Sequence, residues 1–314
     1  MPDVFAEFCA AGLWPGVGQA MAARLAEAGI GSPTEVTAPN LAGLPRMTDR
    51  RANRLVTSFV GAGQLYQIAE LLVPQEIPVR WAARLSDVLG DDAATVLRSD
   101  PWRLLALPDA AVAQADRLAR SVEPDVRRDD PRRGRALVEW TLARHARGGH
   151  TASPQSLVAD GLRPFGVDPQ PALGAALVAG GVVRVPDPAE ESGYGSAEPW
   201  IAREVLARAE STIAEGLARL VRTASTMAGE RAVKGAVNEL DEVQAGAVSL
   251  AAAHGVSLLT GGPGTGKSRT VAAIVALCRT VNASIALAAP TGRAAKRLEE
   301  LAGNNATTVH RLLG

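Results

Sequence analysis

The chain has 314 residues, which is enough for two or three domains. Hydrophobic residues make up 47% and charged residues 21%. This composition is typical of folded proteins and excludes an intrinsically disordered protein. Basic and acidic residues balance at 33 each, so the net charge by itself indicates no nucleic-acid partner.

Neither a membrane protein nor a secreted protein is expected. No stretch approaches the roughly 18 consecutive apolar residues of a membrane span, and the first residues lack the basic region of a secretory signal. The two cysteines, Cys9 and Cys278, lie far apart, which excludes a disulfide framework and a cysteine-based zinc site. We therefore expect a cytoplasmic protein with no membrane partner.

Residues 1–125 are predicted to form a helical domain with tandem, partly degenerate helix-hairpin-helix elements. Two glycines flank Val17, and apolar residues at helical spacing follow them. The pattern resembles a helix-hairpin-helix motif, in which the amides of a glycine turn approach a DNA phosphate. We expect DNA contacts at Gly16, Val17 and Gly18. The alternative is a helix corner that needs glycine only for its shape.

Two later segments, residues 44–48 and 107–111, are expected to be the same kind of turn between short helices, but they lack the glycines. Both begin with Leu-Pro, and the tetrapeptide AARL at residues 22–25 recurs at residues 82–85. These matches predict an old internal duplication in which most copies became packing elements.

A domain boundary is predicted at residues 121–136, where prolines, acidic residues and five arginines cluster. The arginines either face solvent or contact phosphates, and the acidic residues among them favour the solvated face. The five are Arg127, Arg128, Arg132, Arg133 and Arg135. Asp129 or Asp130 is expected to cap a helix that begins at Pro131.

Residues 129–186 are predicted to form a small helical, winged-helix-like domain. The pattern indicates three helices followed by a strand, near residues 131–147, 154–165, 170–179 and 181–185. Residues 187–237 are expected to be a polar linker and then a helix at about 200–222.

The strongest signal is GGPGTGKS at residues 261–268, which matches the complete Walker A pattern. A strand is predicted before it at 255–260 and a helix after it at 269–279, the context that a phosphate loop needs. Glycines let successive amides surround a phosphate, and the helix N-terminus adds partial positive charge. Lys267 is expected to reach the β- and γ-phosphates and Ser268 to ligate Mg²⁺. A chance glycine-rich turn is the alternative.

A second buried strand is predicted at residues 283–289, and it runs into Thr291, Gly292 and Arg293. Ligands dock at the carboxyl ends of parallel strands, so these three residues are candidates to hold a phosphate chain. An ordinary helix start with a surface arginine is the alternative.

Four segments resemble consecutive motifs of the RecD-like superfamily 1 DNA helicases: residues 240–244, 261–268, 289–297 and 308–314. The earlier part of the chain resembles the long bacterial members, which carry helix-hairpin-helix elements and a small helical domain before the motor. The resemblance implies a multidomain fold. An all-α helix-hairpin-helix and winged-helix-like N-terminal region would precede a partial α/β RecA-like P-loop NTPase domain at residues 238–314.

The resemblance also implies roles for single residues, with ATP and Mg²⁺ as the cofactors. Lys267 is the implied catalytic residue, Ser268 the Mg²⁺ ligand, and Gln244 the group that binds the adenine edge, a task for which an amide offers both donor and acceptor. Residues 291–293 correspond to a motif that contacts single-stranded DNA. The implied nucleotide-binding residues are Gln244, Gly262, Pro263, Gly264, Thr265, Gly266, Lys267, Ser268 and Arg269.

The sequence departs from the family pattern after these motifs. An acidic pair at the end of a strand and a second RecA-like domain with an arginine finger should follow, and the sequence contains neither. We therefore expect the N-terminal portion of a helicase that couples ATP hydrolysis to 5′–3′ translocation and duplex unwinding. Its expected partners are single-stranded DNA or a single-strand/duplex junction, and the missing C-terminal motor portion.

Two alternatives stay open. The chain is a non-enzymatic DNA-binding remnant with a vestigial phosphate loop, or a complete small P-loop NTPase of another family. The second alternative needs an aspartate at the end of a later strand, which the sequence does not offer.

Overall fold

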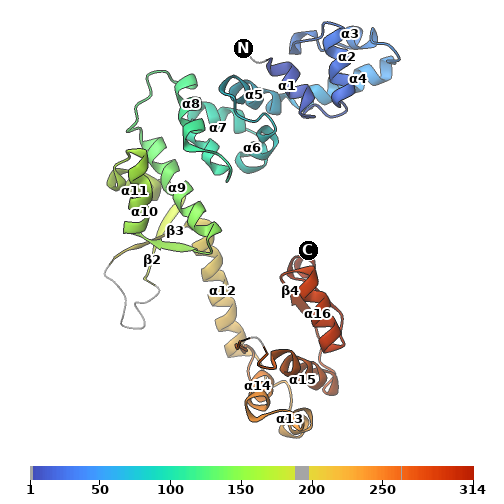
Figure 1. Ribbon diagram of the computed structural model, residues 1–314, viewed down its shortest axis with the longest axis vertical. Helices are drawn as coiled ribbons and strands as arrows, with labels where there is room; N and C mark the ends of the chain where they lie inside the picture. Colours follow the sequence, from blue (N-terminus) through green and yellow to red (C-terminus); the bar gives the residue numbers. More distant parts are fainter. Residues whose placement is uncertain (1–2, 188–197, 263) are drawn as a thin grey trace. The chain divides into compact units, whose positions relative to one another are not determined.

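The computed structural model describes residues 3–187, 198–262 and 264–314. It divides into two compact units, an N-terminal unit of residues 1–208 and a C-terminal unit of residues 209–314 (Figure 1). The four-part division expected from the sequence therefore stays a prediction. In the described part of the chain, no helix has both the length and the apolarity needed to cross a membrane.

Short helices joined by turns build the first part of the N-terminal unit. The earlier helices share an aromatic cluster in which the ring centroids of Trp14 and Phe59 lie 4.8 Å apart. The indole of Trp14 is fully buried and donates to the carbonyl of Leu55 at 3.1 Å. The helices are α1 (Val4–Ala10), α2 (Gln19–Glu27), η1 (Pro33–Glu35), α3 (Ala38–Ala42), α4 (Asp49–Gly61), α5 (Gly63–Leu72), η2 (Val73–Gln75), α6 (Trp81–Leu89), α7 (Ala93–Ser99), η3 (Pro101–Ala106) and α8 (Val112–Val122).

The turn at residues 14–18 and the turn at residues 44–48 have the same shape. In each, the amide of the fourth residue donates to the carbonyl of the first, at 3.0 and 3.1 Å, and the fifth residue caps the next helix. The third residue is left-handed in both, with φ 90° at Gly16 and φ 58° at Arg46. The second turn therefore has the backbone of the glycine turn with an arginine at its third position.

The second part of the N-terminal unit is a three-stranded antiparallel sheet with three helices. The sheet has the order β1-β3-β2, so β3 pairs with both neighbours. Helix α11 packs along α9 (Figure 1). Asp130 caps α9, accepting from the amide of Arg132 at 2.8 Å, as the sequence predicted. The elements are α9 (Pro131–Arg147), β1 (Ala152–Pro154), α10 (Gln155–Leu162), η4 (Arg163–Phe165), α11 (Pro169–Val178), β2 (Val182–Val185) and β3 (Trp200–Arg203).

The expected helix at 200–222 is correct only from residue 204 onward. Residues 200–203 form β3, with Ile201 opposite both Ser153 and Arg184, and α12 (Glu204–Thr223) follows. Hydrogen-bonded neighbours on both sides outweigh the local helical pattern at these four residues.

The expected solvated face is wrong for Arg133, which is 5% exposed. Its guanidinium donates to the carboxylate of Asp116 at 2.9 and 3.1 Å and to the carbonyl of Phe165 at 3.1 Å. Burial raises the pKa of Asp116, but hydrogen bonds from Arg133 and Trp102 outweigh this and hold it below its ordinary value. The pair joins α8 to α9, so these two parts of the unit share one core.

The C-terminal unit contains helices around a two-stranded parallel sheet. Strand β4 pairs with β5, with Ala288 opposite Thr307. A small core lies beneath α13, α14 and α15, and its buried members include Val248, Ala252 and Leu277. The elements are α13 (Glu230–Val237), α14 (Glu242–Ala253), α15 (Lys267–Thr280), β4 (Leu287–Ala289), α16 (Gly292–Ala302), β5 (Ala306–Thr308) and α17 (Val309–Leu313).

The strand expected at residues 255–260 is absent from the described structure, and the one expected at 283–289 is reduced to β4. A strand requires a hydrogen-bonding neighbour. In the described part of this unit only β4 and β5 pair, so residues 255–260 have no ladder to join. Leu258 is accordingly 90% exposed.

Candidate functional site

The glycine-rich loop leads directly into helix α15. Gly266 caps the helix with φ 79°, and its carbonyl accepts from the amides of Arg269 and Thr270 at 2.9 and 3.1 Å. A left-handed residue at this point turns the chain sharply from loop to helix, which suits glycine. Lys267 and the exposed Ser268 are consequently the first two residues of a 14-residue helix, where amides and the helix dipole favour an anion.

The ammonium group of Lys267 lies inside the curve of the loop. It donates to the carbonyls of Gly261 and Gly262 at 2.5 and 2.6 Å and lies 3.4 Å from Oγ1 of Thr265. The Thr265 hydroxyl also donates to the carbonyl of Gly262, at 2.9 Å. The loop is therefore wrapped around a positive charge, with Gly262, Gly264 and Thr265 exposed around it. Pro263, a predicted site residue, lies outside the described residues.

Gln244 packs directly against this loop although it lies 22 positions earlier in the chain than Gly266. A Cβ atom added at Gly266 would overlap Nε2 of Gln244, so a larger residue there would displace the amide from this position. Oε1 of Gln244 is buried and has no hydrogen-bond partner among the described residues. A buried acceptor without a partner is uncommon, and a donor from a ligand beside the loop would satisfy it.

Two contacts hold the segment that carries Gln244. The carboxylate of Asp241 caps α14 and accepts from the amide of Gln244 at 2.8 Å. The guanidinium of Arg269 donates to the carbonyl of Glu239, which ties the start of α15 to the segment before α14. No role for Asp241 was expected from the sequence, although an aspartate three residues before Gln244 at a helix start is the ordinary capping pattern.

These features fit a nucleotide with Mg²⁺. The loop amides, the helix start and Lys267 suit a phosphate chain, and the exposed Ser268 hydroxyl is a hard oxygen ligand of the kind Mg²⁺ accepts beside water and phosphates. The unpartnered Oε1 of Gln244 suits an exocyclic amine of a base.

Thr291, Gly292 and Arg293 lie at the start of α16, two to four residues after β4, and all three are exposed. Thr291 caps the helix, accepting from the amide of Ala294 at 3.3 Å. Thr308 caps α17 in the same way after β5, so both helices begin at the carboxyl edge of the parallel sheet. Among the described residues, no hydrogen bond joins residues 291–293 to the phosphate loop.

The three hairpin residues of the N-terminal unit present different groups to solvent. Gly16 is exposed, and a Cβ added there would approach Leu55 to 3.2 Å. Gly18 is exposed with no atom within 4 Å of an added Cβ. The side chain of Val17 is buried in the core, so only its backbone is placed to meet a ligand.

Comparison with known proteins adds a family relationship. Residues 244–314 match an AAA domain, and residues 62–152 match the ATP-dependent RecD2 DNA helicase HHH domain. The second match begins at the end of α4 and reaches β1, downstream of the hairpin at residues 14–18.

Three curated relatives are similar to the chain. The ATP-dependent RecD2 DNA helicase of Deinococcus radiodurans is 30% identical over 95% of this chain and 43% of its own length. The RecBCD enzyme subunit RecD of Mycolicibacterium smegmatis is 45% identical over 23% of this chain and 17% of its own length. The RecBCD enzyme subunit RecD of Mycobacterium tuberculosis is 43% identical over 22% of this chain and 16% of its own length. The chain spans less than half the length of these relatives, and it belongs to the RecD-like family of helicases.

Proposed function

We propose that residues 261–269 and Gln244 bind ATP with Mg²⁺. The observation that carries the proposal is the ammonium of Lys267 held within the glycine loop, with the unpartnered Oε1 of Gln244 beside Gly266. On binding, Lys267 exchanges its carbonyl partners for β- and γ-phosphate oxygens, and the loop amides donate to the same phosphates. Oε1 of Gln244 accepts from the adenine amine.

Ser268 contributes the protein ligand to Mg²⁺, which when bound neutralises phosphate charge. Arg269, held by Glu239, keeps the start of α15 against the segment that carries Gln244. In hydrolysis Lys267 stabilises the charge that develops on the γ-phosphate, which is its catalytic role in this proposal.

We also propose that the chain supplies the nucleotide-binding and DNA-binding part of an ATP-dependent DNA helicase. The relationship to RecD-like helicases supports this, as does the AAA match over the loop. In this proposal the C-terminal unit is part of a RecA-like motor domain, and residues 291–293 contact single-stranded DNA at the edge of its sheet. The exposed amides at Gly16 and Gly18 contact the DNA backbone in the N-terminal unit.

The second part of the N-terminal unit is, in this proposal, a winged-helix-like unit. Its chain order of helix, strand, two helices and two strands, with sheet order β1-β3-β2, supports that fold. The helix that reads DNA in such units corresponds to α11, whose sequence PQPALGAALV contains no lysine, arginine or histidine. We therefore assign this unit an architectural role and not base reading.

The experiment is a titration of the purified chain with a fluorescent ATP analogue in Mg²⁺. We expect Lys267→Ala to weaken binding by at least tenfold, because a charge-assisted contact to phosphate is worth about 1.5–3 kcal/mol. Lys234→Ala removes one exposed lysine from α13 in the same unit and should leave affinity unchanged. Gln244→Ala should reduce the preference for ATP over GTP while leaving phosphate binding in place.

Equal affinities for Lys267→Ala and Lys234→Ala would refute the nucleotide site. Salt-dependent DNA binding with intact nucleotide-site residues but no ATP binding would instead support the non-enzymatic alternative.

A further inference from the structure

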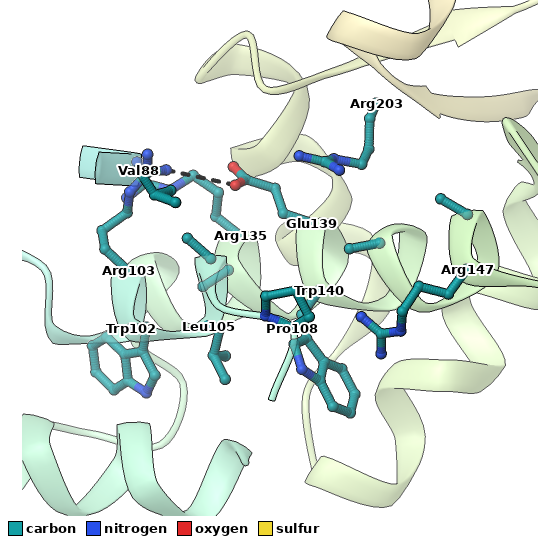
Figure 2. A pocket seen from close by; sticks show the side chains of 14 residues that line it. Val88, Trp102, Arg103, Leu105, Pro108, Arg135, Glu139, Trp140, Arg147 and Arg203 are labelled. Carbon is teal, nitrogen blue, oxygen red and sulfur yellow. Dashed lines mark ion pairs between the residues drawn. The ribbon is translucent and has the colours of Figure 1, made fainter. Parts of the chain in front are cut away.

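A cavity of about 530 Å³ lies between η3 and α9 inside the N-terminal unit. Its walls come from both parts of the unit: Trp102, Arg103 and Pro108 on one side, and residues of α9 with Arg203 on the other (Figure 2). Neither the hairpin residues nor the phosphate loop contributes to it. The cavity is therefore separate from the sites considered so far.

The lining is strongly basic. It contains four arginines and one acidic residue, Glu139, and Figure 2 shows the Glu139 carboxylate between arginine side chains. Arg103 lies 3.5 Å from Glu139. Among the described residues, Arg147 and Arg203 also line the cavity and pair with no carboxylate there. The cavity therefore carries an excess of positive charge.

Arg135, one of the four lining arginines, has incomplete hydrogen bonding. One of its terminal nitrogens donates to Asp100, which is 10% exposed at its side chain. Its Nε atom is buried and has no partner in the described structure. Burial raises the pKa of Asp100, although the charge of Arg135 acts in the opposite direction. The ion pair therefore does not fully offset the cost of burying this carboxylate.

A neighbouring hollow of about 620 Å³ shares Arg103, Arg135, Glu139 and Arg203 with the cavity. Asp100 and Glu204 also line this hollow, so its three arginines face three carboxylates and the excess of positive charge is confined to the first cavity. Arginine binds phosphate oxygens in a bidentate way and is not deprotonated in proteins.

An aromatic wall accompanies the arginines. Trp140 lines the cavity, and the guanidinium of Arg144 lies 4.7 Å from the centroid of its ring. Proteins commonly bind single-stranded nucleic acids in positively charged grooves that contain aromatic side chains. The phosphate backbone lies along the positive charge, and the unpaired bases stack on the aromatic rings.

We propose that this arginine cleft binds the phosphodiester backbone of single-stranded DNA. The proposal rests on the DNA-binding function proposed above and adds a contact surface in the N-terminal unit that is independent of the glycine hairpin. Arg147 and Arg203 supply the phosphate contacts and the excess of positive charge, and Trp140 supplies a wall for bases. Arg103 and Arg135, each paired with a carboxylate, border the same cleft. The contact carries no base information because it reads the backbone.

The test measures binding of the full chain to fluorescent oligo(dT) over a range of salt concentrations. We expect Arg147→Ala with Arg203→Ala to weaken binding by at least tenfold at low salt. The slope of log K against log salt should fall by about 0.7 for each phosphate that the variant no longer neutralises. Lysine at both positions should restore most of the slope but not all of the affinity, since lysine keeps the charge and loses the bidentate geometry.

The matched control is Arg127→Ala with Arg163→Ala. It removes two arginines from the same unit, whose side chains are 80% and 72% exposed and lie outside the cleft. Circular dichroism and tryptophan fluorescence serve to check that each variant is folded. Equal affinities and slopes for the cleft and control variants would overturn the proposal.

Two further outcomes separate this proposal from the function on which it rests. If the unmodified chain binds no oligo(dT), the proposed DNA-binding function fails together with the cleft. If the unmodified chain binds DNA and the cleft variant binds equally well, only the cleft assignment fails. The unmodified chain and the cleft variant are also compared for binding to an acidic polypeptide such as poly-glutamate. If the cleft variant loses this binding but still binds DNA as the unmodified chain does, the cleft belongs to a protein partner and the proposal is overturned.

Discussion

Replacing Asp116 with alanine should destabilise the N-terminal unit severely. The carboxylate accepts from two nitrogens of Arg133, at 2.9 and 3.1 Å, and from the indole of Trp102 at 2.8 Å. The Arg133 side chain is 6% exposed and the Asp116 side chain 21% exposed. Without Asp116, a buried guanidinium and a buried indole lose the carboxylate that joins them.

The magnitude follows from the burial of the remaining charge. Removing one partner of a buried ion pair costs about 3–5 kcal/mol, because the other charge stays desolvated and uncompensated. In a unit of about 200 residues, each kcal/mol lowers the melting temperature by about 2–4 °C. The melting temperature of the N-terminal unit should therefore fall by roughly 6–20 °C.

The assay is thermal unfolding followed by tryptophan fluorescence. All five tryptophans lie in the N-terminal unit, so their emission reports that unit and not the one with the phosphate loop. Asp129→Ala is the control, because it removes an aspartate that pairs with Arg127 at the surface, where both side chains are at least 70% exposed. Surface ion pairs contribute little to stability, so the control should melt with the unmodified chain.

A double variant separates the ion pair from its burial. Asp116→Leu with Arg133→Met replaces both charges by apolar groups, which often preserves the stability of a buried pair site. We expect it to melt well above Asp116→Ala. The reasoning is refuted if Asp116→Ala melts within about 2 °C of Asp129→Ala, the shift expected for less than 1 kcal/mol, or if the double variant is no more stable than the single one.

Three further outcomes are expected. The stabilising contribution of Asp116 is present above the ordinary carboxyl pKa and is lost as pH falls through its lowered folded pKa, so acid unfolding curves should be flatter for Asp116→Asn. Gly266→Ala should weaken ATP-analogue binding, since its Cβ would overlap Nε2 of Gln244 and its φ is 79°; unchanged affinity would contradict the close contact. Gly18→Ala, whose Cβ meets no atom within 4 Å, should keep the fold and weaken duplex binding, whereas Gly16→Ala should also lower the melting temperature.

Features with a local cause were predictable from the sequence. The Walker A loop leads into a helix as expected, because its glycines and the apolar spacing after Lys267 act within one short segment. Helices α9, α10 and α11 and strand β2 also lie where the pattern placed them, and Asp130 caps α9. Caps and helical periodicity depend on neighbours a few residues away, which the sequence displays directly.

Features with a distant cause were not predictable. Residues 255–260 have the composition of a strand, but pairing needs a neighbour that the described part of the unit does not place beside them. Residues 200–203 have a helical pattern, yet they pair with β1 and β2. The cluster at residues 127–135 mixes exposed arginines with Arg133, which is buried because its partner Asp116 lies 17 positions earlier.

Gln244 shows how a distant contact becomes predictable when a family pattern is available. Nothing in the spacing between Gln244 and the phosphate loop indicates contact, and the assignment came from resemblance to the RecD-like motifs alone. The packing of its amide against Gly266 is consistent with that assignment. Its binding role stays a prediction until ATP and GTP affinities are compared in Gln244→Ala.

The internal duplication stays a prediction, and the structure offers one parallel between the two AARL copies. The arginine of each copy reaches a later Leu-Pro segment, although one meets a backbone carbonyl and the other a side-chain carboxylate. Arg24 donates to the carbonyl of Pro45 in the turn at residues 44–48. Arg84, the matching residue, donates to Asp109 in the turn at 107–111, at 2.8 Å.

The backbone of Arg46 points the same way, because a non-glycine residue in the left-handed region costs about 1–2 kcal/mol. A turn inherited from a glycine-containing copy, and held in place by the helices on either side, accounts for that cost. The matching residue of the third segment, Asp109, is not left-handed, so any inheritance of this backbone is limited to the turn at residues 44–48.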